Sequence, residues 1–297
     1  MHPFLNIAVL AARKAGDLIV RHLGRLHEVK VGQKGENDYV SEVDQKAEAL
    51  IIGIIRRAYP DHAILAEESG AHLGNPKKST YCWVIDPLDG TTNFLHGYPQ
   101  FCVSIAVEDR GVLEHAVIYD PLLQEIYTAS RGCGARMNDR RLRVSPRVEL
   151  AGTLLATGFP VRTPAIFDDY LSTFRALSLC TAGIRRAGSA ALDLAHVAAG
   201  RLDGYWEFRL KRWDIAAGAL LVQEAGGRLG NPLGEADFLD TGNILAGSPK
   251  IYEAMLAILA GPECMPHTRI CMGTSAVVGR GAPPAQSQAQ GQNQAQG

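Results

Sequence analysis

Two aspartates, Asp86 and Asp89, follow a hydrophobic run that has the composition of a β-strand. Pro87 stands between them and favours a turn, so that both carboxylates can face one point. With the backbone carbonyl of Leu88 they would form a site made only of oxygen atoms, which suits Mg²⁺ better than Zn²⁺. The segment therefore predicts a divalent-metal site.

Gly90, Thr91 and Thr92 come next and can begin a helix whose first N–H groups are free. A helix N-terminus of this kind binds anions. A phosphate at this place would have metal ions on one side and amides on the other, which is what metal-assisted phosphoryl hydrolysis requires. A plain structural turn is the alternative for this segment taken alone, because Asp-Pro-Leu-Asp-Gly is a common turn composition.

Further acids stand in other parts of the chain. Glu67 and Glu68 follow a strand-like run at Ala63–Ala66, Asp214 opens a predicted helix, and Asp44 lies near the start of another. Each also has a purely structural interpretation. Exposed glutamates are common in loops, and aspartates stabilise helix N-termini as caps or through the helix dipole. Together they predict one acidic site assembled from distant segments.

The elements that must position these residues can be predicted from hydrophobic spacing. Apolar residues at intervals of three and four predict amphipathic helices over 3–23 and 43–58, with Ser41 as the N-cap of the second. The polar stretch Lys30–Asp38 is predicted to be a mobile loop. Glycines and prolines then separate short runs that predict antiparallel strands: Ala63–Ala66, Tyr81–Ile85, Cys102–Val107, Glu114–Tyr119, Gln124–Ala129 and Leu142–Ser145.

From about residue 150 strands alternate with helices, which predicts a layered α/β arrangement. The strands are expected at Thr153–Thr157, Gly204–Phe208 and Ile244–Ala246, and the helices near 165–179, 189–199, 214–225 and 249–260. We place one boundary near 148, giving an N-terminal α+β half over 1–148 and a C-terminal α/β half over 149–264. Residues 265–297 are predicted to form a disordered tail, because from Gly281 onward they carry no charge and no large apolar residue.

Composition narrows the class of protein. The formal net charge is -1, so no overall field attracts the chain to nucleic acid or to an anionic membrane. No uncharged apolar run approaches the roughly 18 residues of a membrane span. The six cysteines lack CxxC or zinc-like spacing. They are expected to be reduced thiols, which favours a cytoplasmic protein with no membrane partner.

Three separated motifs carry a family resemblance: WVIDPLDGTTNF at 83–94, AEES at 66–69 and WDIAAGALLVQEAGG at 213–227. They resemble the inositol monophosphatase family, and most of all its bacterial SuhB-type members, over about residues 1–260. The resemblance implies a fold of alternating α-β-α-β-α layers, as in fructose-bisphosphatase-like sugar phosphatases. It also implies hydrolysis of inositol monophosphate to myo-inositol and phosphate, sensitivity to lithium, and a homodimer.

The resemblance also assigns ligands for Mg²⁺. Positions that match Glu67, Asp86 and the Leu88 carbonyl hold one ion in the family. Positions that match Asp86, Asp89 and Asp214 hold a second, and a weaker third ion is often shared with the Glu67 position. Two ions, with a third in some states, are therefore the expected cofactors.

The remaining family roles concern water and substrate. Asp44 and Thr91 match a pair that activates the attacking water, with Glu68 in a direct or supporting role. The substrate contacts implied by the resemblance lie at Asp89, at the Gly90 and Thr91 amides, and at Thr92, Arg185, Gly188, Ser189, Ala190 and Glu207. Arg185 is expected to reach either the substrate or a subunit interface, and Lys34 matches a loop lysine near the metals.

Two alternatives stay open. Related phosphatases that act on fructose 1,6-bisphosphate, histidinol phosphate or 3′-phosphoadenosine nucleotides share the metal motif. The second alternative starts from six arginines between 131 and 147, which are a solvated face or a surface for RNA or an acidic protein: Arg131, Arg136, Arg140, Arg141, Arg143 and Arg147. SuhB-like proteins are associated with ribosomal-RNA antitermination, so a regulatory contact with the transcription machinery is the competing hypothesis.

Overall fold

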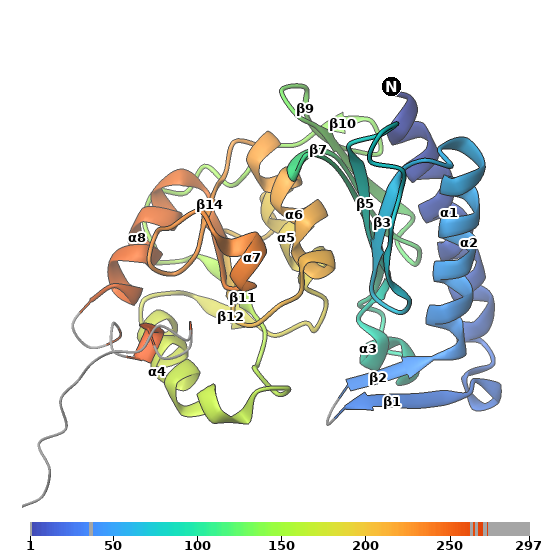
Figure 1. The fold of residues 1–297 in the computed structure, drawn as a ribbon. Helices are drawn as coiled ribbons and strands as arrows, with labels where there is room; N and C mark the ends of the chain where they lie inside the picture. The colour runs from blue at the N-terminus through green and yellow to red at the C-terminus, as the bar shows by residue number, and fades with distance from the viewer. Residues whose placement is uncertain (1, 36–37, 262–263, 265–266, 270–271, 273–297) are drawn as a thin grey trace, which may run out of the picture.

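The structure is a computed structural model of the 297-residue chain and describes residues 2–35, 38–261, 264, 267–269 and 272. Its helices and sheets alternate in five layers, with helices on both outer sides and a helix pair between two sheets (Figure 1). The predicted α-β-α-β-α sandwich is confirmed. Within the described residues, no helix combines the length and the apolar character needed to cross a membrane.

The first layer is formed by α1 (Pro3–Leu23) and α2 (Glu42–Ala58). The predicted stripe of α1 is buried, and Ala8, Ala15 and Ile19 are almost fully covered. α2 begins where predicted, because the Ser41 hydroxyl accepts the N–H groups of Val43 and Asp44. Both helices pack on one face of the larger sheet and enclose the first hydrophobic core.

The larger sheet has eight strands in the order β10-β9-β8-β7-β6-β5-β3-β4, and only the β3–β5 pair is parallel. Its strands are β3 (Ala63–Ala66), β4 (Gly70–His72), β5 (Tyr81–Asp89), β6 (Cys102–Asp109), β7 (Val112–Asp120), β8 (Glu125–Ser130), β9 (Gly134–Met137) and β10 (Arg140–Arg141). Five of the six strands predicted for the first half are thus present.

Two predictions for this half are wrong. The stretch predicted as a mobile loop forms a two-stranded antiparallel ribbon, β1 (Val31–Gly35) and β2 (Asp38–Ser41). Leu142–Ser145 is not a strand. Asn138 and Asp139 adopt positive φ of 45° and 67° and turn the chain back along β9 as β10. The Leu142 N–H still donates to the Ala135 carbonyl of β9, but the Val144 N–H donates to the Ala225 carbonyl at the end of α6, so the chain has left the sheet there.

The middle layer consists of α5 (Ala190–Ala198) and α6 (Arg212–Glu224). Both helices are apolar on nearly every side because a sheet covers each face. Small residues let them approach closely. A Cβ on Gly218 of α6 would lie 2.5 Å from the Cβ of Leu194 on α5. This layer carries the start of α6, and with it Asp214, against the larger sheet.

The second sheet has five strands in the order β12-β11-β13-β15-β14. They are β11 (Leu154–Thr157), β12 (Gly183–Arg185), β13 (Gly204–Glu207), β14 (Arg228–Gly230) and β15 (Ile244–Gly247). α4 (Phe167–Ser178) and α8 (Pro249–Leu259) cover its outer face. The short elements are η1 (Leu26–Glu28), α3 (Thr91–Leu95), η2 (Pro164–Ile166) and α7 (Phe238–Thr241).

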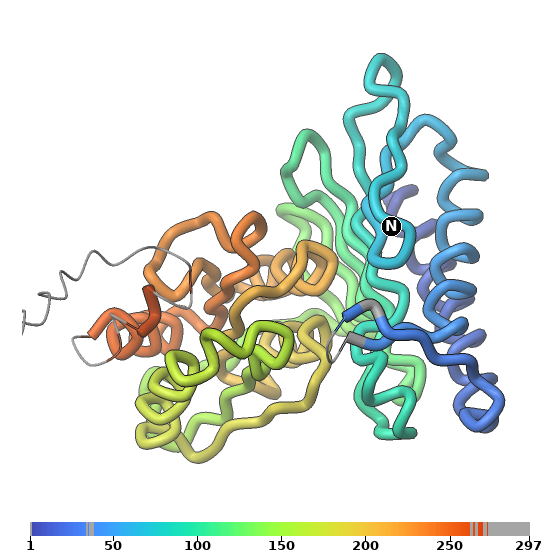
Figure 2. The backbone as a smooth tube through the Cα atoms, turned by 60° about the horizontal axis from the view of Figure 1, so that its bottom comes forward, coloured from blue at the N-terminus to red at the C-terminus, as the bar shows by residue number. Residues whose placement is uncertain are grey.

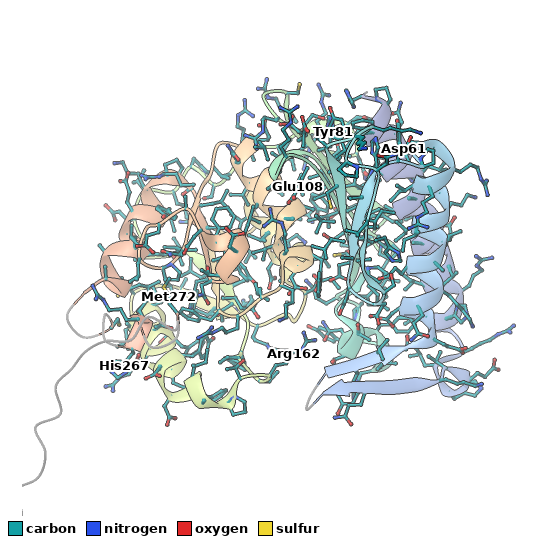
Figure 3. All side chains as sticks on the ribbon, in the orientation of Figure 1. Asp61, Tyr81, Glu108, Arg162, His267 and Met272 are labelled. Atoms are coloured by element: carbon teal, nitrogen blue, oxygen red, sulfur yellow. The ribbon has the colours of Figure 1, made fainter. Side chains whose placement is uncertain are left out.

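The boundary near 148 separates the strands of the two larger sheets, since β10 precedes it and β11 follows it. However, α5 and α6 pack against the eight-stranded sheet, so the division into two domains stays a prediction. Most of the predicted tail lies outside the described residues. In its described part, Thr268 donates a hydrogen bond to the Leu259 carbonyl, and Met272 is buried near α4 (Figure 3).

Candidate active site

A pocket of about 400 Å³ lies between the two halves of the molecule. One wall comes from the end of β5 and the start of α3, and the opposite wall from the 158–163 loop, the end of β13 and the start of α6. The β1–β2 ribbon lies at the same end of the first half (Figure 2) and contributes Tyr39. The pocket therefore requires segments from both halves of the chain.

A β-bulge places Asp86 and Asp89 on the same face of β5. Asp86 lies opposite Ser104 and Asp89 opposite Cys102, so three steps along β5 match two along β6. In a regular strand, residues three apart point to opposite faces, and the extra residue cancels that difference. The sequence predicted that the strand ends at Asp86 and that Pro87 makes a turn. Instead the strand continues to Asp89, and Pro87 occupies the bulge.

Glu67 joins these aspartates from the neighbouring strand. β3 runs parallel to β5 with Ala66 opposite Ile85, so Glu67 comes next to Asp86. Its N–H donates to the Ile85 carbonyl at 3.2 Å, which continues the strand pairing by one residue. Parallel strands bring their carboxyl ends to one edge of a sheet, and this explains why two motifs that are 19 positions apart in sequence meet.

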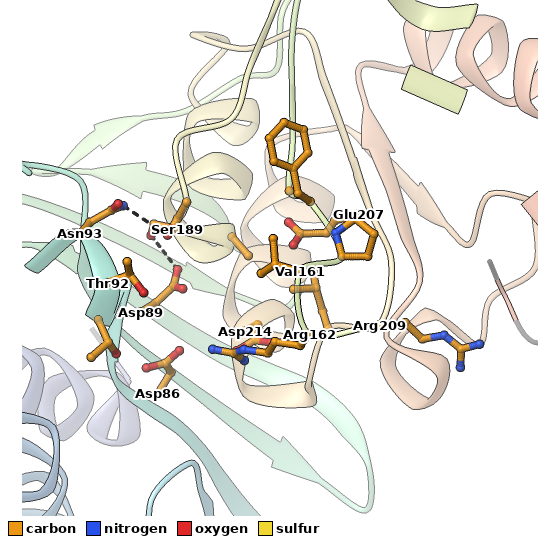
Figure 4. Close-up of a pocket in the computed structure, with 18 of the residues that line it drawn as sticks. Asp86, Asp89, Thr92, Asn93, Val161, Arg162, Ser189, Glu207, Arg209 and Asp214 are labelled. Carbon is orange, nitrogen blue, oxygen red and sulfur yellow. Dashed lines mark hydrogen bonds between the residues drawn. The ribbon is translucent and has the colours of Figure 1, made fainter. Parts of the chain in front are cut away.

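Asp214 approaches from the second half. It lies in the first turn of α6, and its Oδ2 accepts the Lys211 N–H at 2.6 Å. The Ser104 hydroxyl donates to the Trp213 carbonyl at 3.4 Å and links this turn to the larger sheet. Figure 4 shows Asp86 and Asp89 on one side and Asp214 on the other.

The carboxylates repel one another. Burial, and then the negative charges of Glu67, Asp89 and Asp214, raise the pKa of Asp86 well above its usual value. Burial raises the pKa of Asp89 to about 6. Burial, followed by the charge of Asp89, also raises the pKa of Asp214 well above normal. A cluster of buried carboxylates destabilises the folded protein unless positive charge lies nearby, and a divalent cation supplies such charge.

Whether these carboxylates can bind a metal ion depends on their geometry as well as on their chemistry. Within the described residues, no three His, Cys, Asp or Glu side chains already stand in a metal-holding arrangement. Asp89 Oδ2 is engaged by the Ser189 hydroxyl at 2.6 Å and the Ala191 N–H at 2.7 Å. The oxygen-only donor set and its mutual repulsion fit a hard cation, and binding requires the side chains to turn toward it.

Behind the pocket wall, Thr91 connects to Asp44. The Thr91 hydroxyl lies 2.8 Å from Asp44 Oδ1 and 3.1 Å from the Leu88 carbonyl oxygen, and both can accept its proton. Asp44 is fully buried, and Ser41 donates to its other oxygen from its N–H at 2.9 Å and its hydroxyl at 2.5 Å. Burial raises the pKa of Asp44 despite these hydrogen bonds.

Four helices begin at this acidic group. α2 starts at Ser41, α3 at Gly90, α5 at Ser189 and α6 at Lys211. The N-terminal end of a helix carries partial positive charge, which partly offsets buried carboxylates and attracts anions. Gly90 permits the turn into α3, because its φ is +97° and a Cβ would lie 2.8 Å from the Gln100 carbonyl oxygen.

Glu207 forms part of the opposite wall. Burial raises its pKa to about 7, although the Tyr205 hydroxyl, which donates to it, and Arg186 act in the other direction. A Cβ on Gly158 would stand 2.0 Å from a Glu207 carboxylate oxygen, so a larger residue there would displace the carboxyl group from its present position. The wall therefore presents a buried carboxyl that can bond to hydroxyl groups of a ligand.

The pocket contains most residues predicted from the sequence. Its lining includes Glu67, Asp86, Leu88, Asp89, Gly90, Thr91, Thr92, Gly188, Ser189, Ala190, Glu207 and Asp214. Glu68 is not in the lining, and its N–H points instead to Glu48. Arg185 is also outside the lining, and an Nη of its exposed side chain donates to the Ile184 carbonyl. The side chain of Lys34 lies outside the described residues.

Several polar residues of the pocket were not predicted from the sequence. Arg186 lines it in place of Arg185, because successive side chains alternate at the end of β12. Arg162 and Arg209 also line it, and Figure 3 shows Arg162 where the second half faces β2. Asn93 donates to the Gln100, Ala187 and Gly188 carbonyls at 2.7, 2.8 and 3.3 Å, and so links the halves. The loop that carries Arg162 could have been predicted from Gly158 and Pro160, which follow the strand at 154–157.

Comparisons with known proteins agree with this geometry. The model of the inositol monophosphatase family matches residues 1–261. Nus factor SuhB of Pseudomonas aeruginosa is 56% identical over 261 residues, which are 87% of this chain and 96% of that protein. Nus factor SuhB of Escherichia coli is 52% identical over 257 residues, 86% of this chain and 96% of that protein. The crystal structure of extragenic suppressor protein suhB from Bartonella henselae superposes with a TM-score of 0.85 at 45% identity, covering 88% of this chain and all of that one. The chain therefore belongs to the inositol monophosphatase family, whose members are generally metal-dependent phosphatases, and it resembles the SuhB-type members of that family.

Proposed function

We propose that the chain is a Mg²⁺-dependent phosphatase that hydrolyses inositol monophosphate to myo-inositol and phosphate. The observation that carries the proposal is the convergence of four carboxylates on one pocket: Glu67, Asp86, Asp89 and Asp214. They come from three distant segments, and their mutual repulsion calls for divalent cations. A phosphate ester is a substrate whose negative charge suits such a site.

Specific residues would hold the cations. Glu67, Asp86 and the Leu88 carbonyl form one set of donors, and Asp86, Asp89 and Asp214 form a second that shares Asp86. The first set can also take part in a third, weaker site through Glu67. When bound, Mg²⁺ neutralises phosphate charge and makes a water molecule a better nucleophile. Gly90 and Thr91 lie beside these donors in the pocket lining, and their N–H groups would bind the phosphate oxygens.

The protein's own part in the reaction lies with Thr91 and Asp44. The Thr91 hydroxyl directs its proton toward Asp44 Oδ1 or the Leu88 carbonyl, so a lone pair of its oxygen can accept a proton from the attacking water. Asp44 holds the hydroxyl in this direction and can receive a proton through it. The pair thus orients the water toward phosphorus and helps to remove its proton.

The opposite wall would hold the alcohol part of the substrate. Glu207 and the segment from Gly188 to Ala190 offer groups that bond to hydroxyls. Inositol monophosphatase II of Staphylococcus aureus, which is 25–26% identical to this chain, has been crystallised with inositol monophosphate and with 2′-AMP. A nucleotide or sugar phosphate is therefore the alternative substrate class for this chain.

A phosphate-release screen tests the proposal. Inositol 1-phosphate, fructose 1,6-bisphosphate, histidinol phosphate, 3′-phosphoadenosine 5′-phosphate and 2′-AMP would be compared with Mg²⁺, with EDTA and with Mg²⁺ plus Li⁺. We expect the highest kcat/KM for inositol 1-phosphate, no activity in EDTA and inhibition by Li⁺. Higher kcat/KM for another substrate would reassign the substrate, and equal activity in EDTA would contradict the metal mechanism.

The Asp89→Asn variant tests the ligand assignment separately. It keeps the size of the side chain and removes the negative charge that would hold a cation. We expect phosphate release to fall at least 100-fold, in line with the loss of a main metal contact. Full activity in this variant would show that Asp89 is not a ligand.

A second candidate function concerns the transcription machinery, because the relatives named above are Nus factors. Of the six arginines between 131 and 147, Arg131 pairs with Glu114 at 3.2 Å and Arg147 with Asp203 at 3.6 Å. Four others, Arg136, Arg140, Arg141 and Arg143, are exposed on or beside β9 and β10, at one edge of the larger sheet. We propose this edge as a contact surface for RNA within an antitermination complex.

The arginine surface is tested by replacing Arg140, Arg141 and Arg143 with Gln and measuring RNA retention over a salt series. We expect weaker binding and a salt slope reduced by up to about three charges. Unchanged affinity and slope would leave these residues as a solvated face. The Asp89→Asn variant should retain RNA binding if the two functions are separate.

We also propose that the protein is cytoplasmic and forms a homodimer. Within the described residues, Cys82, Cys102, Cys133 and Cys180 form no disulfide, which agrees with a reducing cytoplasm. The family resemblance favours a homodimer. Analytical ultracentrifugation at micromolar concentration should give a species of twice the 32.0 kDa chain mass, and a monomer under these conditions would contradict the dimer.

A further inference from the structure

A buried glutamate on α2 reaches the loop that carries Glu67. Glu48 is only 2% exposed, and its two carboxylate oxygens bind two successive backbone N–H groups. Oε2 accepts from Glu68 at 2.7 Å and Oε1 accepts from Ser69 at 2.8 Å. These contacts join residues 20 and 21 positions apart, so they link a helix to the end of β3.

The chemistry of this contact requires a carboxylate. Two N–H donors point at one side chain, and a carboxylate offers an acceptor oxygen to each. A glutamine offers one oxygen and one NH₂ group, so a donor would then face a donor. A buried charge is costly unless it is fully hydrogen-bonded. A buried glutamate at this position therefore indicates that fixing the N–H groups of Glu68 and Ser69 matters to the protein.

The contact fixes the backbone on one side of Glu67. On the other side the Glu67 N–H donates to the Ile85 carbonyl of β5. The backbone of Glu67 is therefore held from both directions, by β5 before its Cα and by Glu48 after it. This leaves only side-chain rotation to adjust the carboxylate of Glu67 relative to Asp86.

We propose that Glu48 is a positioning residue that sets the direction of the Glu67 carboxylate and so determines the affinity for Mg²⁺. The inference rests on the proposed function, because it assumes that Glu67 holds a cation. Glu48 lies four residues after Asp44 on the same face of α2. One helix therefore orients both the Asp44–Thr91 pair and the loop of Glu67.

The test compares two glutamates that each accept two backbone N–H groups, Glu48 in a buried place and Glu224 in a half-buried one. Glu224, at the end of α6, also binds two loop N–H groups, Gly132 at 2.8 Å and Gly134 at 2.7 Å. It lies ten residues from Asp214, about 15 Å along the helix. Glu48→Gln and Glu224→Gln remove equivalent bonds, so Glu224→Gln controls for a general loss of stability. Mg²⁺ binding would be measured by titration calorimetry, alongside phosphate release over a Mg²⁺ series and the Tm.

We expect Glu48→Gln to weaken Mg²⁺ binding about 10-fold or more, as other partners of metal ligands do. The half-saturating Mg²⁺ concentration should rise by the same factor, while kcat at saturating Mg²⁺ returns toward that of the wild type. Glu224→Gln should lower the Tm without changing Mg²⁺ affinity. Equal Mg²⁺ affinity in the two variants would overturn the positioning role.

Glu48→Asp provides a second variant in case Glu48→Gln does not fold. It keeps the charge but is one methylene too short to reach both N–H groups, so Mg²⁺ affinity should again fall. Wild-type affinity in a folded Glu48→Asp protein would overturn the inference. A wild-type chain that neither binds Mg²⁺ nor releases phosphate would instead contradict the proposed function, which keeps the two failures distinct.

Discussion

At the scale of single residues, the Thr91 hydroxyl connects the pocket to a buried acid. It lies within hydrogen-bonding distance of both Asp44 and the Leu88 carbonyl, while Ser41 holds the far oxygen of Asp44. The hydroxyl therefore has few alternatives to its present direction. A group held in this way can orient a water molecule without reorganising when the reaction begins.

Replacing Thr91 by Val keeps the shape of the side chain and removes the hydroxyl. We expect kcat to fall roughly 100- to 10,000-fold, the usual contribution of general acid–base groups, with little change in Mg²⁺ affinity. Steady-state kinetics at saturating Mg²⁺ measure this. Thr91→Ser is the matched control and should keep most of the activity. If Thr91→Val were as active as Thr91→Ser, the hydroxyl would have no part in the reaction.

Arg185 and Arg186 offer a second comparison at this scale. Arg186 lines the pocket and its guanidinium lies over the Phe159 ring at 5.4 Å, whereas Arg185 is exposed outside it. We expect Arg186→Gln to raise KM for the phosphate ester about 10-fold, because it removes a cation facing an anionic ligand. Arg185→Gln should leave KM unchanged. The reverse result would mean that the ligand approaches from the other side of β12.

At the scale of elements, the start of α5 and the end of β5 hold each other. The Ser189 hydroxyl caps α5 by accepting the Leu192 N–H at 3.4 Å and donates to Asp89 at 2.6 Å. The Ala191 N–H adds a second bond to Asp89. A carboxylate from the first half thus binds the N-terminus of a helix from the second, where the helix dipole favours negative charge.

Removal of this cap should cost stability. We expect Ser189→Ala to lower the free energy of unfolding by about 1 kcal/mol, the usual value for a lost N-cap, and to weaken Mg²⁺ binding. Urea denaturation measures the first effect and calorimetry the second. Ser248→Ala is the comparison, because Ser248 precedes α8 without a side-chain capping bond and its hydroxyl donates instead to the Arg147 carbonyl at 3.4 Å. An equal loss in both variants would show that the Ser189 cap adds no more to stability than this one long hydrogen bond.

At the scale of the whole molecule, the pocket exists only because the two sheets enclose α5 and α6. This middle layer also contains the partly buried His196, whose Nε2 is buried and has no hydrogen-bond partner in the described part of the chain. Burial, and then the charge of Arg201, lowers the pKa of His196 to about 4. In the unfolded chain the pKa of histidine is about 6.5.

These values predict a pH dependence of stability. Between pH 6.5 and 4, His196 is protonated in the unfolded chain but still neutral in the folded protein. The free energy of unfolding therefore falls as the pH falls through this window. The loss of stability is at most about 1.4 kcal/mol per pH unit for this one proton and is absent well above pH 6.5. Urea denaturation of His196→Gln should show a flatter curve between pH 6.5 and 4. His115→Gln should flatten it too, because burial lowers the pKa of His115 to about 4. If the free energy of unfolding of His196→Gln changed with pH as steeply as that of the wild type, His196 would not be a source of the pH dependence.

Much of the fold could be predicted from the sequence, since local patterns decide helices and strands. The stripe of α1, the Ser41 cap of α2 and the alternation of strands and helices after residue 150 all depend on neighbouring residues. The β1–β2 ribbon was missed because its pairing brings no apolar alternation to either strand. The strand expected at 142–145 was wrong because the chain leaves β9 after Leu142, and the Val144 N–H donates to the Ala225 carbonyl at the end of α6.

The acids of this site can be identified from the sequence alone, because the motif at 83–94 and its partners at 66–69 and 213–227 contain them. How they come together depends on the tertiary structure. The bulge at Pro87 turns Asp86 and Asp89 to one face, the end of β12 selects Arg186 over Arg185, and Glu48 reaches the loop of Glu67. Each of these depends on bonds between segments far apart in the chain, and local sequence patterns carry no information about such bonds.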